Sequence, residues 1–314
     1  MPFSHHSHSG QFCKHASGTL EDVVKEAIRQ KFQLFCLTEH VPRYRVQDLY
    51  PEEQGISLDE LYAQFKAFLK EAHHLKALYA SQITLLVGLE TEFITAVDLT
   101  KVEQLLNEHP REIEFIVGSV HHVNAIPIDF DKPTFEKAFL SCSFSSSSDA
   151  VTTSSPSYFL ESYLDTQWEL MRTLKPEVIG HFDLCRLYTP DLKLDEHIGI
   201  WGRVQRNILY AIDYGALFEI NAAAFRKGWN TAYPGPEVLQ FILANKGRIT
   251  LSDDSHGPHA VGLNYGKMKS YLEANGVKDV WRLRESGECN EAGRFVDAVL
   301  VEDVFKDPFW TDRE

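Results

Sequence analysis

Two histidines near the start of the chain are the first residues that could do chemistry. His6 and His8 stand two positions apart, within residues 4–10. In a β-strand this spacing places both imidazoles on the same face. Two neutral imidazoles directed at one point suit a transition-metal ion. A remnant of an expression tag is also rich in histidine, although usually as an unbroken run, so a metal site here requires further ligands.

Further histidines and carboxylates stand at the ends of short apolar runs. Such runs are typical of strands buried in a parallel sheet. We expect strands at residues 3–8, 33–37, 83–89, 115–120, 177–180, 217–220 and 248–252. The polar groups that follow them include Glu39 and His40, Glu90, His121 and His122, His181 and Asp183, and Asp253, Asp254 and His256.

Helical periodicity separates the expected strands. Thr19 with Asp22, and Ser57 with Glu60, match the capping-box pattern that opens a helix. We expect helices at residues 20–31, 57–80, 99–108, 158–174, 195–214, 234–247 and 267–275, with Pro234 starting the sixth of them. Alternation of strands and helices predicts an α/β fold with a parallel sheet. Polar groups at nearly every strand end favour a barrel over a doubly wound sheet, since all carboxyl ends of a barrel open on one face.

Composition limits the class of protein. The 314 residues are 44% hydrophobic and 24% charged, as in a soluble globular protein, and we expect one domain over residues 1–314. No apolar run is long enough to span a bilayer, and we see no signal peptide. The five scattered cysteines indicate a reducing compartment, most simply the cytosol. Residues 141–157 are serine-rich and predict a flexible surface insertion.

The net charge of −14 argues against nucleic acid as a partner, because an acidic surface repels a phosphate backbone. An anionic substrate could still bind beside metal cations. Neither GxGxxG nor GxxxxGK[ST] occurs at a strand–helix turn, so both nucleotide-binding fingerprints are missing.

The order of the polar motifs resembles the PHP family, the polymerase and histidinol-phosphatase metallophosphoesterases. The matching motifs are His6-x-His8, Thr38-Glu39-His40, Gly88-Leu89-Glu90, Gly118-Ser119-Val120-His121, Gly180-His181 and Asp254-Ser255-His256. Residues 4–10, 37–40, 219–221 and 226–228 resemble the histidinol-phosphatase branch. The resemblance implies a distorted barrel of seven βα units that holds up to three metal ions.

The resemblance also implies which residues bind each ion. The first ion takes His6, His8, Glu90 and Asp254. The second shares Glu90 as a bridge and adds His121 and His181. The third takes His15, His40 and His256 and helps to bind phosphate. These ligand types suit zinc, iron or manganese. Two ions joined by a carboxylate can lower the pKa of a shared water and hold a phosphoryl oxygen, so Glu90, Asp254 and His256 are the expected catalytic residues.

Residues beside the expected ligands have competing interpretations. Asp253 competes with Asp254, which shares a face with His256 and is preferred, and Asp183 is expected to support His181. Glu92 shares a face with Glu90 and either contacts the site or is solvated. His5 and His122 are expected to point away from their neighbours.

Three residues are expected to bind substrate. Arg226 and Asn221 follow a strand end, and arginine suits a bidentate contact with phosphate. Arg186 is a weaker candidate of the same kind. The alternative for each arginine is a surface charge.

The expected reaction is hydrolysis of L-histidinol phosphate to L-histidinol and phosphate, in histidine biosynthesis. The nearest rival is a PHP phosphoesterase for another small phosphate ester. An exonuclease is disfavoured, because the chain is acidic and has no polymerase region. A non-catalytic metal-binding scaffold is the alternative from another class, and a broken ligand set would favour it, whereas every expected position is filled.

Overall fold

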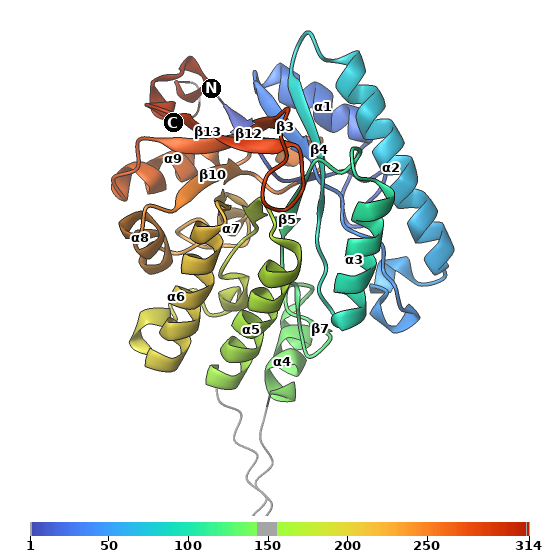
Figure 1. The fold of residues 1–314 in the computed structure, drawn as a ribbon. Coiled ribbons are helices and arrows are strands. Elements are labelled where there is room, and N and C mark those ends of the chain that lie inside the picture. The colour runs from blue at the N-terminus through green and yellow to red at the C-terminus, as the bar shows by residue number, and fades with distance from the viewer. Residues whose placement is uncertain (1, 143–155, 312, 314) are drawn as a thin grey trace, which may run out of the picture.

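Seven parallel strands form a nearly closed barrel in the computed structural model, which describes residues 2–142, 156–311 and 313 (Figure 1). Their order is β1-β3-β4-β5-β8-β9-β10, and every neighbouring pair is parallel. The first and last strands come together where the backbone N–H of His5 donates to the carbonyl oxygen of Leu251 at 3.1 Å. This confirms the barrel predicted from the sequence.

The barrel strands are short and almost wholly buried. They are β1 (Phe3–Ser4), β3 (Leu34–Leu37), β4 (Thr84–Glu90), β5 (Phe115–Gly118), β8 (Val178–Ile179), β9 (Leu217–Asn221) and β10 (Arg248–Ser252). Each falls within or next to an apolar run of the sequence, because a strand covered on both faces must be apolar along its length. The second part of the expected first strand is separate: β2 (Ser7–His8) pairs with β11 (Ser255–His256) beyond the barrel.

Helices cover the outside of the barrel (Figure 1). They are α1 (Leu20–Arg29), α2 (Leu58–Leu78), α3 (Ala96–Glu108), α4 (Lys132–Ser141), α5 (Pro156–Leu174), α6 (Ile198–Asp213), α8 (Pro236–Ala244) and α9 (Tyr265–Ala274), while the short α7 (Ala223–Arg226) follows the end of β9. Both expected capping boxes are present, Thr19 with Asp22 and Ser57 with Glu60. None of the helices described is long and apolar enough to cross a bilayer.

The expected starts of several helices were wrong by two or three residues: α3 begins at Ala96 instead of 99, α6 at Ile198 instead of 195, and α9 at Tyr265 instead of 267, and α4 was not expected. Helix α8 begins at Pro236 with Gly235 as its N-cap, two residues later than the predicted Pro234. The cause is a β-bridge between Tyr233 and Asn221, whose backbone groups exchange hydrogen bonds of 2.8 and 3.2 Å. The bridge ties the chain to the end of β9 just before Pro234.

An antiparallel hairpin, β12 (Val280–Glu285) with β13 (Val296–Val301), lies outside the barrel. Its Leu283 donates a backbone hydrogen bond to Nε2 of His5 at 3.0 Å. Both chain ends lie near this hairpin in Figure 1. A second small hairpin, β6 (His122–Val123) with β7 (Ile126–Pro127), follows β5. Most of the serine-rich insertion, residues 143–155, lies outside the described residues.

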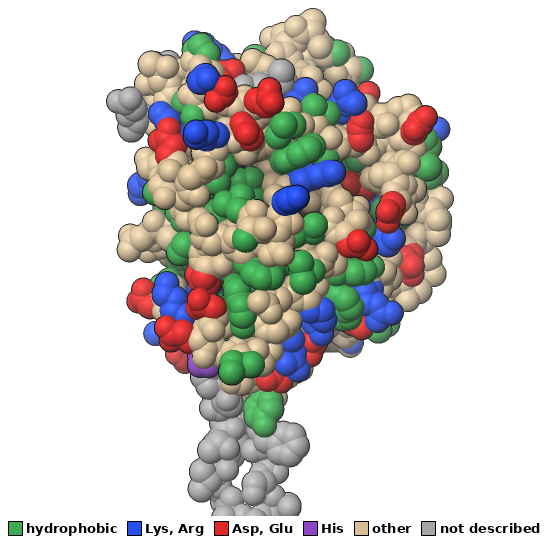
Figure 2. Space-filling model, turned by 60° about the vertical axis from the view of Figure 1, so that its left-hand side comes forward, with side chains coloured by type: hydrophobic (Ala, Val, Ile, Leu, Met, Phe, Trp, Pro, Cys, Tyr) green, Lys and Arg blue, Asp and Glu red, His purple; other side chains and the backbone are tan. Residues whose placement is uncertain are grey.

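The face of the molecule in Figure 2 carries Lys and Arg side chains interspersed with Asp and Glu. The charges of both signs are spread over several elements on this face, as on an ordinary protein surface.

Candidate metal centre

All nine expected ligands come from segments at or beyond the carboxyl ends of barrel strands. Glu90 ends β4, His8 lies in β2 and His256 in β11, while the other six lie in connecting segments: His6, His15, His40, His121, His181 and Asp254. The register of β2 with β11 pairs His8 with His256. Asp254 has a φ of +47°, a left-handed backbone that non-glycine residues seldom adopt and that is concentrated at functional sites.

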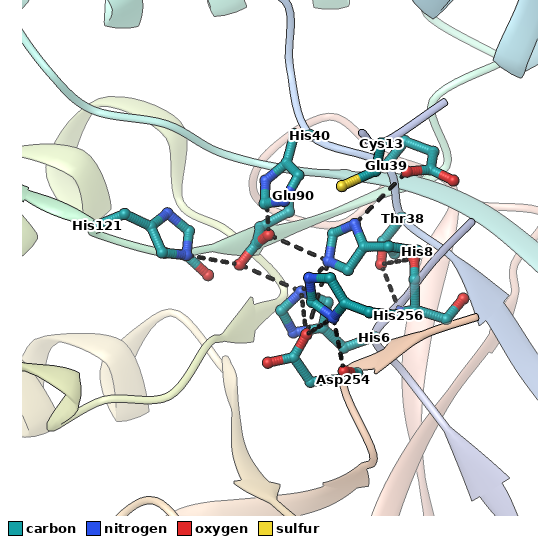
Figure 3. A network of polar contacts seen from close by, with 12 residues as sticks. His6, His8, Cys13, Thr38, Glu39, His40, Glu90, His121, Asp254 and His256 are labelled. Atoms are coloured by element: carbon teal, nitrogen blue, oxygen red, sulfur yellow. Dashed lines mark hydrogen bonds and ion pairs between the residues drawn. The ribbon is translucent and has the colours of Figure 1, made fainter. Parts of the chain in front are cut away.

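Glu90 lies at the centre of the cluster (Figure 3). Its Oε1 lies 3.2 Å from Nε2 of His6, 3.2 Å from Nε2 of His121 and 3.1 Å from Nε2 of His181. Its Oε2 lies 3.3 Å from Nε2 of His8. Both carboxylate oxygens therefore face ring nitrogens, which is the arrangement that a bridging carboxylate needs.

The spacing of these ring nitrogens fits bound cations. Nε2 of His6 lies 3.1 Å from Nε2 of His8, and Nε2 of His121 lies 3.2 Å from Nε2 of His181. Ligand atoms at about 2.0–2.1 Å from a tetrahedral ion are roughly 3.3 Å apart. Each pair of ring nitrogens also lies beside a carboxylate oxygen of Glu90. A divalent ion would bind the lone pairs of these atoms, which shared protons satisfy only in part.

The ligand atoms form overlapping groups, and the atoms within each group all lie within 4.8 Å of one another. The groups are His6–His8–Glu90, His6–His181–Asp254, His8–Asp254–His256, Glu90–His121–His181 and Cys13–His15–His40–His256. Every expected ligand belongs to at least one of them. The last group also contains Cys13, which was not expected.

Electrostatics keep the two central carboxylates ionised. Burial raises the pKa of Glu90, but His6, His121 and His40 outweigh it and hold the pKa well below its usual range. Burial likewise raises the pKa of Asp254, and His6 and His256 bring it well below normal. Two buried carboxylates that stay anionic can balance the charge of divalent ions.

Three buried glutamates orient the histidines. Oε2 of Glu219 lies 2.9 Å from Nδ1 of His6, and since a carboxylate only accepts, Nδ1 holds a proton and Nε2 is the ring atom left to bind a metal. Oε2 of Glu92 lies 3.3 Å from Nδ1 of His121, so Glu92 contacts the site and is not solvated. Oε2 of Glu39 lies 3.6 Å from Nδ1 of His8. Sequence reasoning missed this role for Glu219 and Glu39.

Asn221 does not have the expected position on a substrate surface. Its carboxamide is fully buried and donates to Oε1 of Glu219 at 2.7 Å and to Oδ2 of Asp254 at 3.3 Å. Its Oδ1 accepts from the backbone N–H of Ala223 at 2.8 Å. Asn221 therefore positions the carboxylates around the cluster.

Arg186 is also displaced from its expected role. Its guanidinium is buried, contacts Asp183, and donates to Oε1 of Glu237 at 2.5 Å and to the carbonyl oxygen of Leu192 at 2.6 Å. Asp183, expected to support His181, instead accepts from Arg186 and from the backbone N–H of Gly235. The expected substrate contact of Arg186 finds no support in this geometry.

His5 and His122 point away from the cluster, as expected. Nδ1 of His5 lies 2.9 Å from Oγ1 of Thr250. Burial lowers the pKa of His5 to about 3, so its ring is neutral. Nδ1 of His122 lies 3.4 Å from Oε2 of Glu92.

A cavity of about 470 Å³ opens over the cluster. Its floor includes Glu90, His121, His181, Asp254 and His256. Its walls include two cationic side chains, two acidic ones and two aromatic rings: Arg226, Lys227, Glu52, Asp129, Tyr50 and Phe130. This volume is in the range of sites for small organic ligands.

Arg226 lies where an arginine could hold an anion over the cluster. Its Nη2 donates to the backbone carbonyl oxygen of Asp254 at 3.2 Å, so the guanidinium sits beside a candidate ligand. Lys227, which sequence reasoning did not single out, lies 4.0 Å from Oδ2 of Asp129 across the same cavity.

The barrel fold and the converging histidines and carboxylates define the class of this protein, which is a metallophosphoesterase-like barrel. The PHP domain family matches residues 4–223, about two thirds of the chain, and this protein belongs to that family. The fold and the motif order are both those that the sequence resemblance implied.

Relatives and solved structures agree with this assignment. The chain is 44% identical over 308 residues to a Schizosaccharomyces pombe protein named "Probable histidinol-phosphatase", covering 97% of this chain and 96% of the relative. It is 32% identical to the histidinol-phosphatase of Saccharomyces cerevisiae, covering 98% and 99% of the two chains. The fold matches that of a histidinol phosphate phosphatase from Lactococcus lactis, solved with zinc, L-histidinol and phosphate, with a TM-score of 0.64 at 18% identity over 94% of this chain and 98% of the other.

Proposed function

We propose that this protein hydrolyses L-histidinol phosphate to L-histidinol and phosphate, as a metal-dependent phosphoric monoester hydrolase of histidine biosynthesis. The observation that carries the proposal is the cluster of histidines around Glu90 at the floor of a cavity walled by Arg226 and Lys227. Family membership and the 44% identity over nearly the whole chain support the same reaction.

We assign the ligands as three overlapping sets. The first ion is held by His6, His8, Glu90 and Asp254, and the second by Glu90, His121 and His181. The third is held by His15, His40 and His256. Zinc, iron and manganese all suit these donors, and bound ions supply Lewis acidity and an activated water. Zinc is also the metal in the Lactococcus lactis structure.

The chain's own residues then have distinct tasks. Oε1 of Glu90 lies beside His6 of the first set and beside His121 and His181 of the second, so this carboxylate would hold both ions. Arg226 holds the phosphate from outside the cluster, because its guanidinium offers paired donors to phosphate oxygens. Asp254 and His256 complete the floor on the side where Arg226 lies.

The rest of the cavity complements the remainder of the substrate. Phe130 is 44% exposed and stacks on Tyr50, with ring centroids 6.1 Å apart and planes at 24°. Such rings provide an apolar face for an imidazole. Asp129 and Glu52 provide negative charge for the ammonium group of an amino alcohol. A substrate with phosphate, ammonium and imidazole groups thus meets a partner for each.

Residues 1–314 form one domain in this proposal. The five cysteines are unpaired, which suits a reducing compartment such as the cytosol.

A panel of phosphate esters tests the proposal. Phosphate release is measured from L-histidinol phosphate, O-phosphoethanolamine, which lacks the imidazole, and a phosphoalkyl imidazole that lacks the ammonium. We expect L-histidinol phosphate to have the highest kcat/KM. Asp129→Asn should reduce the difference in kcat/KM between substrates with and without the ammonium group. A different ester preferred by a factor of ten or more would replace the proposed substrate, and no release from any ester would favour a non-catalytic scaffold.

A further inference from the structure

Cys13 lies among the candidate ligands of the third ion. It belongs to the loop between β2 and α1, and its side chain is 5% exposed. Its Sγ lies 3.1 Å from Nε2 of His15. The ligand atoms of Cys13, His15, His40 and His256 all lie within 4.8 Å of one another. Figure 3 shows the sulfur of Cys13 pointing toward the ring of His40.

The other contacts of the three histidines leave ring nitrogens available for an ion. Nδ1 of His15 lies 3.2 Å from Oε1 of Glu52, and Nδ1 of His256 lies 3.0 Å from the carbonyl oxygen of Asp254. Both partners only accept, so each Nδ1 carries the proton and each Nε2 keeps a lone pair. Nδ1 of His40 lies 3.0 Å from Oε2 of Glu90, while its Nε2 is buried without a hydrogen bond. An orphaned nitrogen of this kind indicates a missing partner.

Backbone hydrogen bonds hold the Cys13 loop in place. The N–H of Cys13 donates to the carbonyl oxygen of Ser9 at 2.8 Å, and its own carbonyl oxygen accepts from Ala16 at 3.1 Å. Gln64 on α2 contacts the carbonyl oxygen of Phe12. Cys13 and His15 are therefore presented to the same point by a braced loop.

We propose that Cys13 binds the third ion as a thiolate, so that this ion has one cysteine and three histidine ligands and selects zinc. In a tetrahedral zinc site, sulfur and nitrogen ligands are about 3.5 Å apart, so the observed 3.1 Å requires only a shift of a few tenths of an ångström. The thiol releases its proton to solvent when the ion binds. A thiolate is a soft ligand and disfavours manganese and magnesium. The inference rests on the proposed metal centre but is independent of the substrate.

Cobalt substitution tests this directly, because a thiolate ligand gives cobalt(II) a near-ultraviolet charge-transfer band that histidine ligands do not. Protein stripped of metal is titrated with cobalt(II) in the absence of substrate. We expect the band to grow with the third equivalent. Cys13→Ser and Cys13→Ala should lose the band and bind that equivalent more than about tenfold more weakly. Cys289→Ser, an exposed cysteine outside the cluster, is the matched control and should keep both.

Alkylation of the unaltered protein keeps the test valid if the Cys13 variants fail to fold. Iodoacetamide should modify Cys13 in metal-free protein, and zinc should protect it, as read by mass spectrometry. A fully loaded protein without the charge-transfer band, or with a band unchanged in Cys13→Ser, would overturn the proposal, as would alkylation of Cys13 at the same rate with zinc bound. A charge-transfer band without turnover of L-histidinol phosphate would remove the proposed function and leave the Cys13 ligand standing. Failure to bind any metal would overturn both.

Discussion

Replacing Glu219 with glutamine should weaken metal binding although the side chain touches no ion in the proposed centre. Glu219 is fully buried, and all of its partners are donors. Its Oε2 accepts from Nδ1 of His6 at 2.9 Å, and its Oε1 accepts from the backbone N–H of His181 at 2.8 Å and from Nδ2 of Asn221 at 2.7 Å. Burial raises the pKa of Glu219, but the charge and hydrogen bond of His6 together with the charge of His181 lower it overall, so the side chain is a carboxylate.

A glutamine cannot serve these three donors, because its amide nitrogen must face one side. If the amide nitrogen faced His181 and Asn221, it would meet two donors. If it faced His6, it would meet one donor, and His6 could respond by moving its proton from Nδ1 to Nε2. That tautomer removes the lone pair that His6 offers to the metal. Loss of one charge-assisted hydrogen bond costs about 1.5–3 kcal/mol. This agrees with the roughly 10–100-fold loss of metal affinity that follows from changing such an orienting group.

Zinc affinity is measured by competition with a chelator, and stability by chemical denaturation of the metal-free protein. Glu177→Gln is the matched control, since Glu177 is also a buried carboxylate, bound to Arg294 at 2.6 Å and to the N–H of Ile116 at 3.0 Å, away from the metal centre. Both variants should lose stability, and only Glu219→Gln should lose zinc affinity. Equal zinc affinity in Glu219→Gln and the parent protein would refute the orienting role.

Further variants test the metal centre, the substrate contact and the packing of the fold one at a time. Glu90→Gln should lower kcat by several orders of magnitude and weaken metal binding, because one charge no longer holds two ions; full metal content with near-normal kcat would exclude a bridge. Arg226→Ala should leave metal content unchanged and raise KM for L-histidinol phosphate, and unchanged kinetics would make it a surface charge. Gly118→Ala should destabilise the fold by about 1–3 kcal/mol, since a Cβ there would lie 2.4 Å from Cγ of Pro176. Gly202→Ala, in α6 with nothing within 4 Å of the added Cβ, should instead stabilise by about 0.5–1 kcal/mol, and denaturant unfolding compares the two.

The barrel could be predicted because its physical causes are local. Buried parallel strands require apolar runs, and a ligand at a strand end can be recognised by its place after such a run. Glu90 and His121 are examples, since each follows a run of β-forming residues and each lies in the cluster. The offset at Pro236 arose because a bridge joins Asn221 to Tyr233, twelve residues later, and no periodic pattern of the sequence signals such a bridge.

Contacts between distant segments explain what sequence reasoning missed. Arg186 follows a strand end like a substrate ligand, but Glu237, 51 residues later, binds its guanidinium in the interior. Cys13 lies in a loop whose shape no periodic pattern reveals. Glu219 did carry a signal: a charged residue in the middle of the buried run of β9 needs a buried partner, and His6 is that partner.

Removal and return of metal tests the central claim most directly. Phosphate release from L-histidinol phosphate is measured on chelator-treated protein and again as zinc is added in known equivalents. We predict no release without metal and recovery of activity as the centre around Glu90 fills, with full activity by about three equivalents. Release that is unaffected by complete removal of metal, or that stays absent in fully loaded and folded protein, would contradict the account.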